Sequence, residues 1–361
     1  MNDLAPVPPP LTRWEYAGLM VTYWCNAKCA FCYVYSAPDR GGKMSPADAV
    51  AFWRGLQQHA AGESRTMKIH LAGGEPFGDW PQLLSIVRAA HEAGLPPLEK
   101  IETNAFWASD ENLVRARLEQ LDAFGMNMLH ISADAYHQEF IPLDRVVRLL
   151  SMARRVLGGR RVRVRWWDTL LRPVDVRGRA VHEKQSIFAL ATAKHADRIA
   201  GRAADRLAPL LPRYPAEHFR NRRCESEILQ SRHVHVDAFG NVFPGVCAGI
   251  ILGNLHEQPA DVLWERLSRA WPSNPVLEAV VRGGSYALMQ RAIEVGYIPR
   301  VDGYASKCHL CSDARQFLFE AGIWPHAIGP ADCYANARDH SETAAWREAI
   351  ERRRVSLPVI Q

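Results

Sequence analysis

Three cysteines lie within eight residues near the start of the chain, at Cys25, Cys29 and Cys32, with the spacing C-x3-C-x2-C. Thiolates this close in sequence can fold around one soft metal centre, but a closed structural zinc site requires a fourth ligand. A [4Fe–4S] cluster held by three thiolates instead keeps one iron open for a substrate or a cofactor. The spacing therefore favours a reactive iron–sulfur site over a structural metal site.

Two short loops follow strand-like stretches in the first part of the chain. The cysteine segment follows an apolar, β-branched stretch at residues 19–24, and Gly73-Gly74-Glu75-Pro76 follows a similar stretch at residues 67–71. By itself the second loop is typical of a turn, because glycine allows unusual φ values and proline adds rigidity. Both loops are therefore expected at the ends of strands, where ligands bind in α/β sheets.

The cysteine segment, with the aromatic Phe31 before its last cysteine, and the Gly-Gly-Glu-Pro loop together resemble the signature loops of radical S-adenosylmethionine (SAM) enzymes. The resemblance implies that the open iron binds SAM, that Phe31 lies at the cofactor, and that the second loop receives the methionine amino group through its backbone and Glu75. One electron, from a donor such as flavodoxin or ferredoxin, would then release a 5′-deoxyadenosyl radical. That radical would take a hydrogen atom from an unactivated C–H bond of the substrate.

Helices and strands are expected to alternate through the first half of the chain. Such βαβα repetition with short connections predicts a mostly parallel sheet. Five or six units are too few for an eight-stranded barrel, so the expected fold class is α/β, a partial (β/α)6 TIM-like barrel with a smaller C-terminal α+β cluster-binding domain. A helix capped by Ser109 is expected before the strand at 127–131, and Leu207–Leu211 is the candidate for the sixth strand.

Further polar residues follow the predicted strands. Thr103, Asn104, Ser132 and Asp134 are expected to contact the cofactor, although such side chains also cap helices. If a carbonyl group or a crosslink forms, a residue must accept the accompanying proton. The sequence does not choose among the candidates for this role, which are Tyr136, His137, Glu139, Arg165 and Asp168.

The remaining five cysteines all lie beyond residue 220, at Cys224, Cys247, Cys308, Cys311 and Cys333. A C-x2-C pair such as 308/311 is typical of thiolate metal sites, but spacing alone does not separate zinc from an iron–sulfur cluster. A cysteine, a predicted hairpin at 233–243, a second cysteine and a distal C-x2-C resemble the twitch and SPASM extensions of radical SAM enzymes.

Five cysteines are fewer than the two-cluster SPASM domain requires. The resemblance therefore implies the one-cluster twitch version, with one auxiliary [4Fe–4S] cluster on Cys224, Cys247, Cys308 and Cys311. Cys333 would either replace one of these four ligands or be a spare.

Length and composition limit how many domains the chain can form. The 361 residues, 48% of them hydrophobic, suffice for one large domain or two ordinary ones. We expect a lead-in at 1–14, the barrel at 15–212, the auxiliary-cluster domain at 213–335 and a C-terminal helix within 336–361.

The sequence shows no transmembrane stretch and no signal peptide, so a cytoplasmic protein without a membrane partner is expected. The formal charge of +5 is modest and its arginine clusters lack interleaved aromatics, so a nucleic-acid partner is not expected.

Three functional hypotheses remain open. The first is a radical SAM oxidoreductase, a dehydrogenase or epimerase, acting on a small polar substrate of the sugar or aminocyclitol type, because few residues precede the first strand to form a peptide-recognition domain. The second is a radical SAM/SPASM-type maturase of ribosomal peptides. The third is a zinc or iron–sulfur binding module without catalysis, which would explain the cysteines but neither Gly73–Pro76 nor the β/α repetition.

Overall fold

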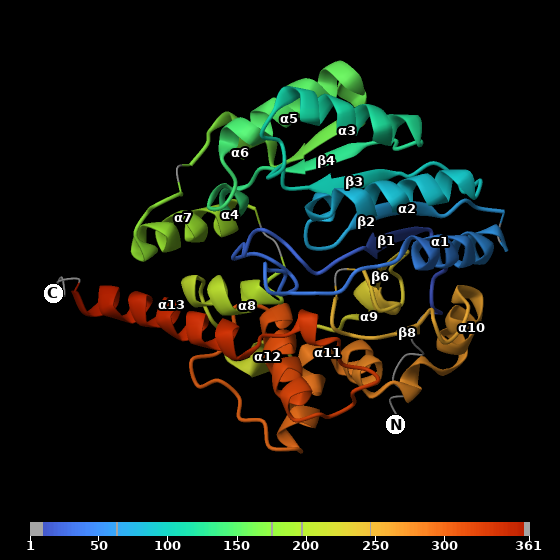
Figure 1. The fold of residues 1–361 in the computed structure, drawn as a ribbon. Helices are drawn as coiled ribbons and strands as arrows, with labels where there is room; N and C mark the ends of the chain where they lie inside the picture. Colours follow the sequence, from blue (N-terminus) through green and yellow to red (C-terminus); the bar gives the residue numbers. More distant parts are fainter. Residues whose placement is uncertain (1–9, 63, 175, 196–197, 246, 357–361) are drawn as a thin grey trace.

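One mixed sheet runs through the structure, a computed structural model that describes residues 10–356 apart from 63, 175, 196–197 and 246 (Figure 1). Its eight strands lie in the order β5-β4-β3-β2-β1-β6-β7-β8. Strands β1 to β6 are mutually parallel where they pair, and β7 and β8 are antiparallel to their neighbours. The strands are β1 Tyr16–Met20, β2 Lys68–Ala72, β3 Lys100–Thr103, β4 Leu129–Ser132, β5 Val162–Arg165, β6 His233–Asp237, β7 Asn241–Pro244 and β8 Gly253–Asn254.

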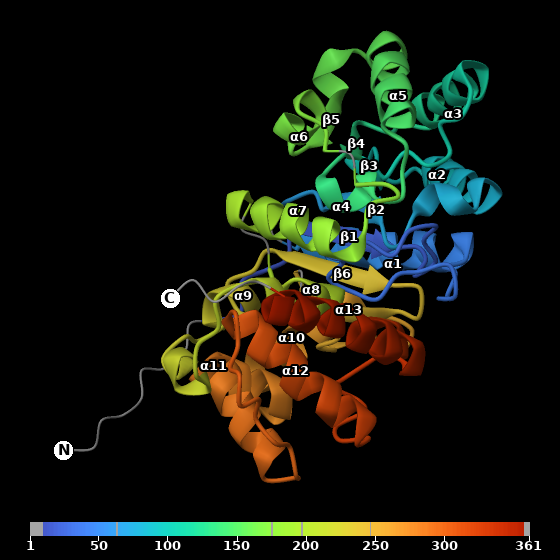
Figure 2. The ribbon, with the colours of Figure 1, turned by 90° about the vertical axis from the view of Figure 1, so that its left-hand side faces the viewer.

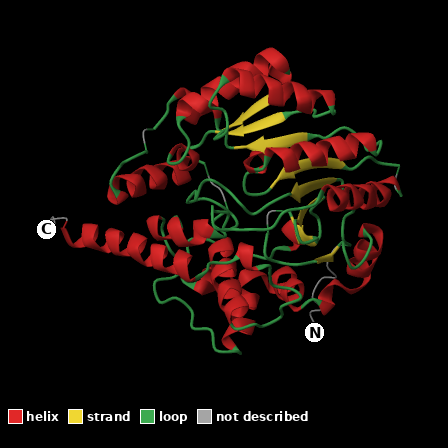
Figure 3. Ribbon diagram, viewed as in Figure 1, coloured by secondary structure: helices red, strands yellow, loops and turns green. Residues whose placement is uncertain are grey.

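Helices connect the parallel strands and cover the outer face of the sheet, as Figure 3 shows. The connecting helices are α1 Pro46–Ala61, α2 Trp80–Glu92, α3 Glu111–Ala123, α4 Ala135–Gln138 and α5 Leu143–Val156. The next group, α6 Trp167–Leu171, α7 Val181–Lys194, α8 Arg202–Arg206 and α9 Glu225–Ile228, leads to β6. The C-terminal group consists of α10 Ala260–Ala270, α11 Pro275–Ile293, α12 Lys307–Glu320 and α13 Ala337–Ser356.

The two faces of the sheet differ in chemistry. In β2, Ile69 and Leu71 are fully buried in the main hydrophobic core. Because successive side chains of a strand point to opposite faces, His70 lies on the other face, inside the curve of the sheet. This concave face carries the polar residues of the strands, and it leads to the loops at their carboxyl ends.

The sixth strand differs from the sequence prediction. Residues 207–211 form no strand; they contain a single 3-10 turn, Ala208–Leu210. Pro209 within this segment has no N–H group to donate to a ladder. The place beside β1 is instead taken by β6, the first strand of the hairpin expected at 233–243. The sheet therefore continues from the barrel into the C-terminal region (Figure 2), and among the described residues its edges β5 and β8 do not pair to close it.

Smaller differences concern the ends of elements. Residues 1–9 of the expected lead-in lie outside the described residues, and residues 10–14 form no helix or strand but pack against the fold. Trp14 is buried, and its N–H group donates to His59 Nε2 at 3.3 Å. Strand β1 ends at Met20, before the predicted end at 24, and Asp110 rather than Ser109 caps α3. No helix in the described part of the chain is long and apolar enough to cross a membrane.

Candidate active site

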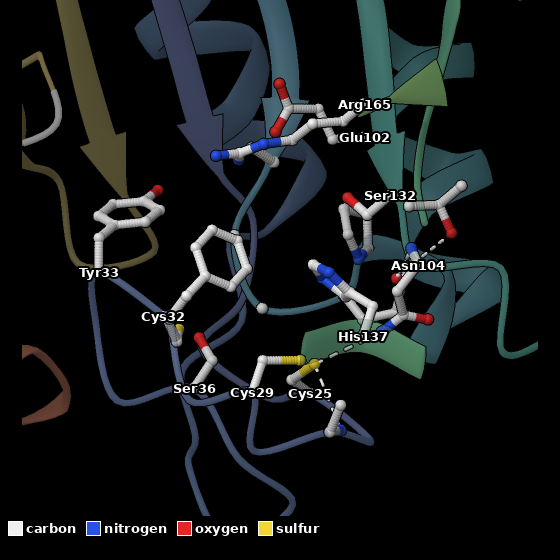
Figure 4. Close-up of a pocket in the computed structure, with 18 residues that line it drawn as sticks. Cys25, Cys29, Cys32, Tyr33, Ser36, Glu102, Asn104, Ser132, His137 and Arg165 are labelled. Carbon is white, nitrogen blue, oxygen red and sulfur yellow. Dashed lines mark hydrogen bonds between the residues drawn. The ribbon is translucent and has the colours of Figure 1, made fainter. Parts of the chain in front are cut away.

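The three N-terminal cysteines line one cavity at the carboxyl ends of the parallel strands. Figure 4 shows Cys25, Cys29 and Cys32 together on one side of this cavity and Glu102 with Arg165 on the opposite side. Four residues separate the end of β1 from Cys25, and the N–H group of Cys25 donates to the carbonyl of Ala37 at 3.1 Å. The loop thus directs its three thiols inward.

The thiols have the surroundings that an iron–sulfur cluster requires. Burial raises the pKa of the Cys25 and Cys29 thiols, so binding of a metal centre must displace their protons. The N–H group of Ala27 donates to Cys25 Sγ at 3.4 Å, and Asn104 Nδ2 donates to the same sulfur at 3.7 Å. Both donors would stabilise a thiolate, so the residues present fit a cluster bound at three positions.

The glycine-rich loop packs directly against the cysteine loop. A Cβ atom on Gly74 would lie 2.0 Å from the carbonyl oxygen of Trp24, and one on Gly73 would lie 2.4 Å from that of Thr22. Gly73 also has a φ of 135°, which L side chains rarely adopt. The N–H group of Gly74 donates to Thr22 O at 2.7 Å. Glycine at both positions is therefore required for the two loops to meet.

Glu75 connects this loop to the end of β3. Its carboxylate accepts hydrogen bonds from the Thr103 hydroxyl (2.8 Å), the Asn104 N–H (2.6 Å) and the Phe77 N–H (3.1 Å). Burial raises the pKa of Glu75 to about 7, and these three donors oppose that shift. Glu75 therefore orders the rim of the cavity in addition to any contact with a ligand.

The other residues expected at the cofactor divide into two groups. The cavity is lined by Phe31, Gly73, Gly74, Glu75, Pro76, Thr103, Asn104 and Ser132. Asp134 is fully buried behind it and caps α4 by accepting from the N–H groups of Tyr136 and His137. Its carboxylate also accepts from His137 Nδ1 at 2.8 Å, so Asp134 positions His137, whose side chain lines the cavity.

Of the five candidates for proton transfer, the structure brings His137 and Arg165 to the cavity. The Arg165 guanidinium lies 4.9 Å from the centre of the Phe31 ring. Tyr136 is buried with its hydroxyl 2.6 Å from Thr192 Oγ1, and Glu139 pairs with Lys184 at 2.9 Å. Asp168 pairs with Lys194 and His195. The side chains of Tyr136, Glu139 and Asp168 therefore do not line the cavity.

Tyr33 and Glu102 are among the lining residues that were not singled out from the sequence. Glu102 and Tyr33 line the cysteine cavity and also a second cavity deeper in the concave face. Glu102 lies at the end of a predicted strand, and alternation along that strand places it on the same face as Lys100. That period-two pattern was the available signal.

Four of the five C-terminal cysteines meet at a separate place. Cys224, Cys247, Cys308 and Cys311 line one small cavity together with apolar side chains such as Ile250 and Val280. Cys224 precedes α9, Cys247 follows β7, and the C-x2-C pair lies in the first turns of α12. Burial raises the pKa of Cys308 to about 12. Arg198, Lys307 and Arg315 also line the cavity and would offset the negative charge of bound thiolates.

Cys333 lies away from this group. It is buried, and its sulfur is 3.4 Å from the Tyr23 hydroxyl, which donates to Asp237 at 2.9 Å. Cys333 does not line the four-cysteine cavity, and the eight cysteines are all free thiols.

Comparison with known proteins finds similarity mainly in the N-terminal part of the chain. The family model of the radical SAM superfamily matches residues 19–172, which include the cysteine loop, the glycine loop and strands β2 to β5. A PqqA peptide cyclase from Ruegeria pomeroyi is 34% identical over 112 residues. That match covers 31% of this chain and 27% of the length of the relative.

The solved structures that align with this backbone have low sequence identity to the chain. BtrN in complex with AdoMet and 2-DOIA is 16% identical with a TM-score of 0.45, covering 76% of this chain and 89% of BtrN. The structure of anSMEcpe with bound AdoMet is 12% identical with a TM-score of 0.41, covering 96% of this chain and 97% of that one.

Proposed function

We propose that the chain, whose residues 19–172 match the radical SAM superfamily, is an enzyme that cleaves SAM reductively and removes a hydrogen atom from an unactivated C–H bond of a small polar substrate. The cofactors of this family are a [4Fe–4S] cluster and SAM. The observation that carries the proposal is that three thiols and the glycine-rich loop line the same cavity.

The protein's own residues would hold and orient the cofactors. Cys25, Cys29 and Cys32 would bind the cluster, and when bound the two cofactors supply a 5′-deoxyadenosyl radical. The bare backbone of Gly73 and Gly74 leaves room for the methionine end of SAM, and Glu75 offers a carboxylate to its ammonium group. The Phe31 ring at the cavity wall would exclude water from the reacting atoms.

A polar cavity on the concave face favours a small polar substrate. It encloses about 270 Å³ and is lined by Lys100, Glu102, Arg165, Arg198 and three histidines, with Phe31 and Tyr33. This volume lies near the lower end of small-molecule sites, roughly 300–1,000 Å³. Phe31, Tyr33, Glu102 and Arg165 also line the cysteine cavity, so a substrate held here would face the radical.

We assign the proton acceptor to His137 as part of this proposal. A carboxylate only accepts hydrogen bonds, so the contact with Asp134 keeps the proton on His137 Nδ1. In the neutral imidazole, Nε2 then carries the free lone pair that can accept a proton, and the side chain lines the cavity. A net oxidation also requires an electron acceptor. We propose an auxiliary [4Fe–4S] cluster on Cys224, Cys247, Cys308 and Cys311 for this purpose.

A peptide substrate is the second candidate, and the similarity to a PqqA peptide cyclase favours it. The two candidates differ in where the substrate would lie. A small molecule would enter the concave cavity completely, whereas a peptide would present one side chain to it and leave the rest of its backbone outside.

Anaerobic reconstitution with iron and sulfide, followed by reduction with dithionite and addition of SAM, tests the proposal. We expect 5′-deoxyadenosine and methionine in equal amounts by liquid chromatography and mass spectrometry. Their absence from a fully reconstituted protein would contradict it. Deuterated aminocyclitols and amino sugars, compared with deuterated peptides, would then identify the substrate class by deuterium in 5′-deoxyadenosine.

A further inference from the structure

Three histidines meet on the concave face of the sheet, beneath the cysteine cavity. They are His70 on β2 and His233 and His235 on β6, and each offers a ring nitrogen within 4.8 Å of those of the other two. The ring centres of His233 and His235 are 4.5 Å apart, and that of His70 lies 5.4 and 5.5 Å from them. We propose that these three imidazoles form a binding site for one divalent transition-metal ion such as Zn²⁺.

The sheet itself brings these side chains together. His70 and His235 stand opposite the same residue of β1, Gly18, one on each side. A Cβ atom on Gly18 would lie 2.6 Å from His70 Cε1 and 2.7 Å from His235 Nε2. Glycine in the centre of a strand is normally unfavourable, because it adds no packing and costs more chain entropy. Its presence here allows imidazoles from two non-adjacent strands to approach across β1.

The hydrogen bonds of the cluster leave nitrogens available for a metal. His235 Nδ1 donates to the carbonyl of Gly245 at 2.5 Å, which leaves Nε2 with a free lone pair. His70 Nδ1 and His233 Nε2 are buried without any hydrogen-bond partner. His70 is 2% exposed, and a buried polar atom of this kind is usually satisfied by a protein group, a water molecule or a bound ion.

The protonation of the three histidines is compatible with a metal. Burial lowers the pKa of all three histidines, so the rings are neutral at pH 7. Lys100 lies on the adjacent strand, but its ammonium group pairs with Glu102 at 2.6 Å. Tyr16 stacks on His70, with ring centres 4.9 Å apart. Glu102 is the one carboxylate among the described residues that line this cavity, which Lys100, Arg165 and Arg198 also line, so a divalent ion would compete with three cations for it.

The ligand set selects the class of metal. Imidazole nitrogen suits zinc and the neighbouring transition metals rather than calcium or magnesium, and three histidines with an open fourth position are a known arrangement for zinc. At Zn–N distances of about 2.0–2.1 Å the nitrogens would be roughly 3.3 Å apart, so the rings must close by on the order of 1 Å. The open position would face the cavity that Glu102 and Arg165 share with the cysteine site.

Zinc binding to the full-length chain with reconstituted clusters tests the site without reference to activity. After incubation with Zn²⁺ and removal of the unbound metal, we expect about one zinc per chain by mass spectrometry. X-ray absorption at the zinc edge should then show nitrogen ligands at about 2.0–2.1 Å. Sulfur ligands at about 2.3 Å, or no retained zinc, would overturn the proposal in the unaltered protein.

Matched variants assign the zinc to its ligands. His70→Gln and His235→Gln should each weaken zinc binding at least tenfold in competition with a chelating dye. The control His130→Gln alters a histidine that lies 3.8 Å from Glu102 but outside the cluster, and it should bind zinc normally. Cys308→Ser should also keep this zinc. Loss of zinc in Cys308→Ser with retention in both histidine variants would place the metal on the thiols and overturn the proposal.

Discussion

The two groups of thiols differ in the number of ligands and in the space beside them. Cys25, Cys29 and Cys32 lie on a single loop and line a cavity that also contains polar and charged side chains. The four cysteines of the C-terminal group come from three separate segments and line a much smaller cavity, whose walls combine apolar side chains with Arg198, Lys307 and Arg315. The first group provides three ligands and room beside them, whereas the second provides four ligands and little space.

Cysteine thiolates can therefore support two kinds of chemistry, depending on how many of them bind one metal centre. A metal centre with three protein ligands keeps one position for an exogenous group, and a centre with four is closed to it. The first arrangement suits a site where a cofactor is bound and cleaved. The second suits a site that transfers electrons or stabilises the fold. Variants at each group of thiols distinguish these two roles.

The largest effect is expected at the open site. Changing Cys25, Cys29 and Cys32 together to Ala should abolish SAM cleavage completely, because no ligand remains to hold the cluster that binds SAM. Iron in the reconstituted protein should fall from about eight to about four atoms per chain, since each [4Fe–4S] cluster holds four. Unchanged iron content would show that these thiols hold no cluster.

At the closed site, the expected loss is confined to substrate turnover. Ala at position 224, 247, 308 or 311 should remove about half of the iron and stop turnover, while uncoupled SAM cleavage persists at the first site. Cys333→Ala is the matched control, because its sulfur contacts Tyr23 and not the other four cysteines. If Cys333→Ala lost iron and one of the other four variants kept all of its iron, Cys333 would be the ligand in place of that cysteine.

A smaller effect is expected for Glu75→Ala. Loss of a charge-assisted hydrogen bond to the methionine ammonium of SAM, roughly 1.5–3 kcal/mol, corresponds to about a tenfold to hundredfold weaker affinity. Isothermal titration with SAM under anaerobic conditions measures it. The control Glu92→Ala removes an exposed carboxylate at the end of α2. Normal SAM affinity combined with lost iron would give Glu75 a purely structural role.

The smallest effect concerns the contact between the two N-terminal loops. Gly74→Ala would place a methyl group 2.0 Å from a backbone oxygen, and the overpacking should lower the free energy of unfolding by about 1–3 kcal/mol. Gly55→Ala is the control, because a Cβ there meets no atom within 4 Å. In the middle of α1 it should stabilise by about 0.5–1 kcal/mol. Chemical denaturation of both variants compares them.

Much of this site could be predicted from local sequence. The cysteine loop, the glycine loop and the alternation of helices and strands depend on residues close together in the chain, such as Ser45 with Asp48 at the start of α1. The carboxyl ends of parallel strands then bring Thr103, Asn104 and Ser132 to the same cavity. Cys224, Cys247, Cys308 and Cys311 also gather as the resemblance to twitch domains implied.

Long-range pairing was not encoded in any local pattern. The sixth parallel strand was expected at 207–211, yet the sheet uses β6. A strand's partner depends on the whole fold, because many β-branched segments fit the same ladder. The histidine cluster was missed for the same reason. His233 and His235 share one face by alternation, but His70 joins them only once β6 is placed beside β1.

The position of β1 has a consequence for synthesis of the protein on the ribosome. Its ladder to β2 can form early, but its other neighbour, β6, is made roughly 200 residues later, or about 10–40 s at about 5–20 residues per second. During that interval the nascent chain exposes an apolar, unpaired strand edge, of the kind that promotes association between chains. Fragments that stop before residue 233 should therefore aggregate, and slow translation of the middle of the gene should lower the yield of folded protein.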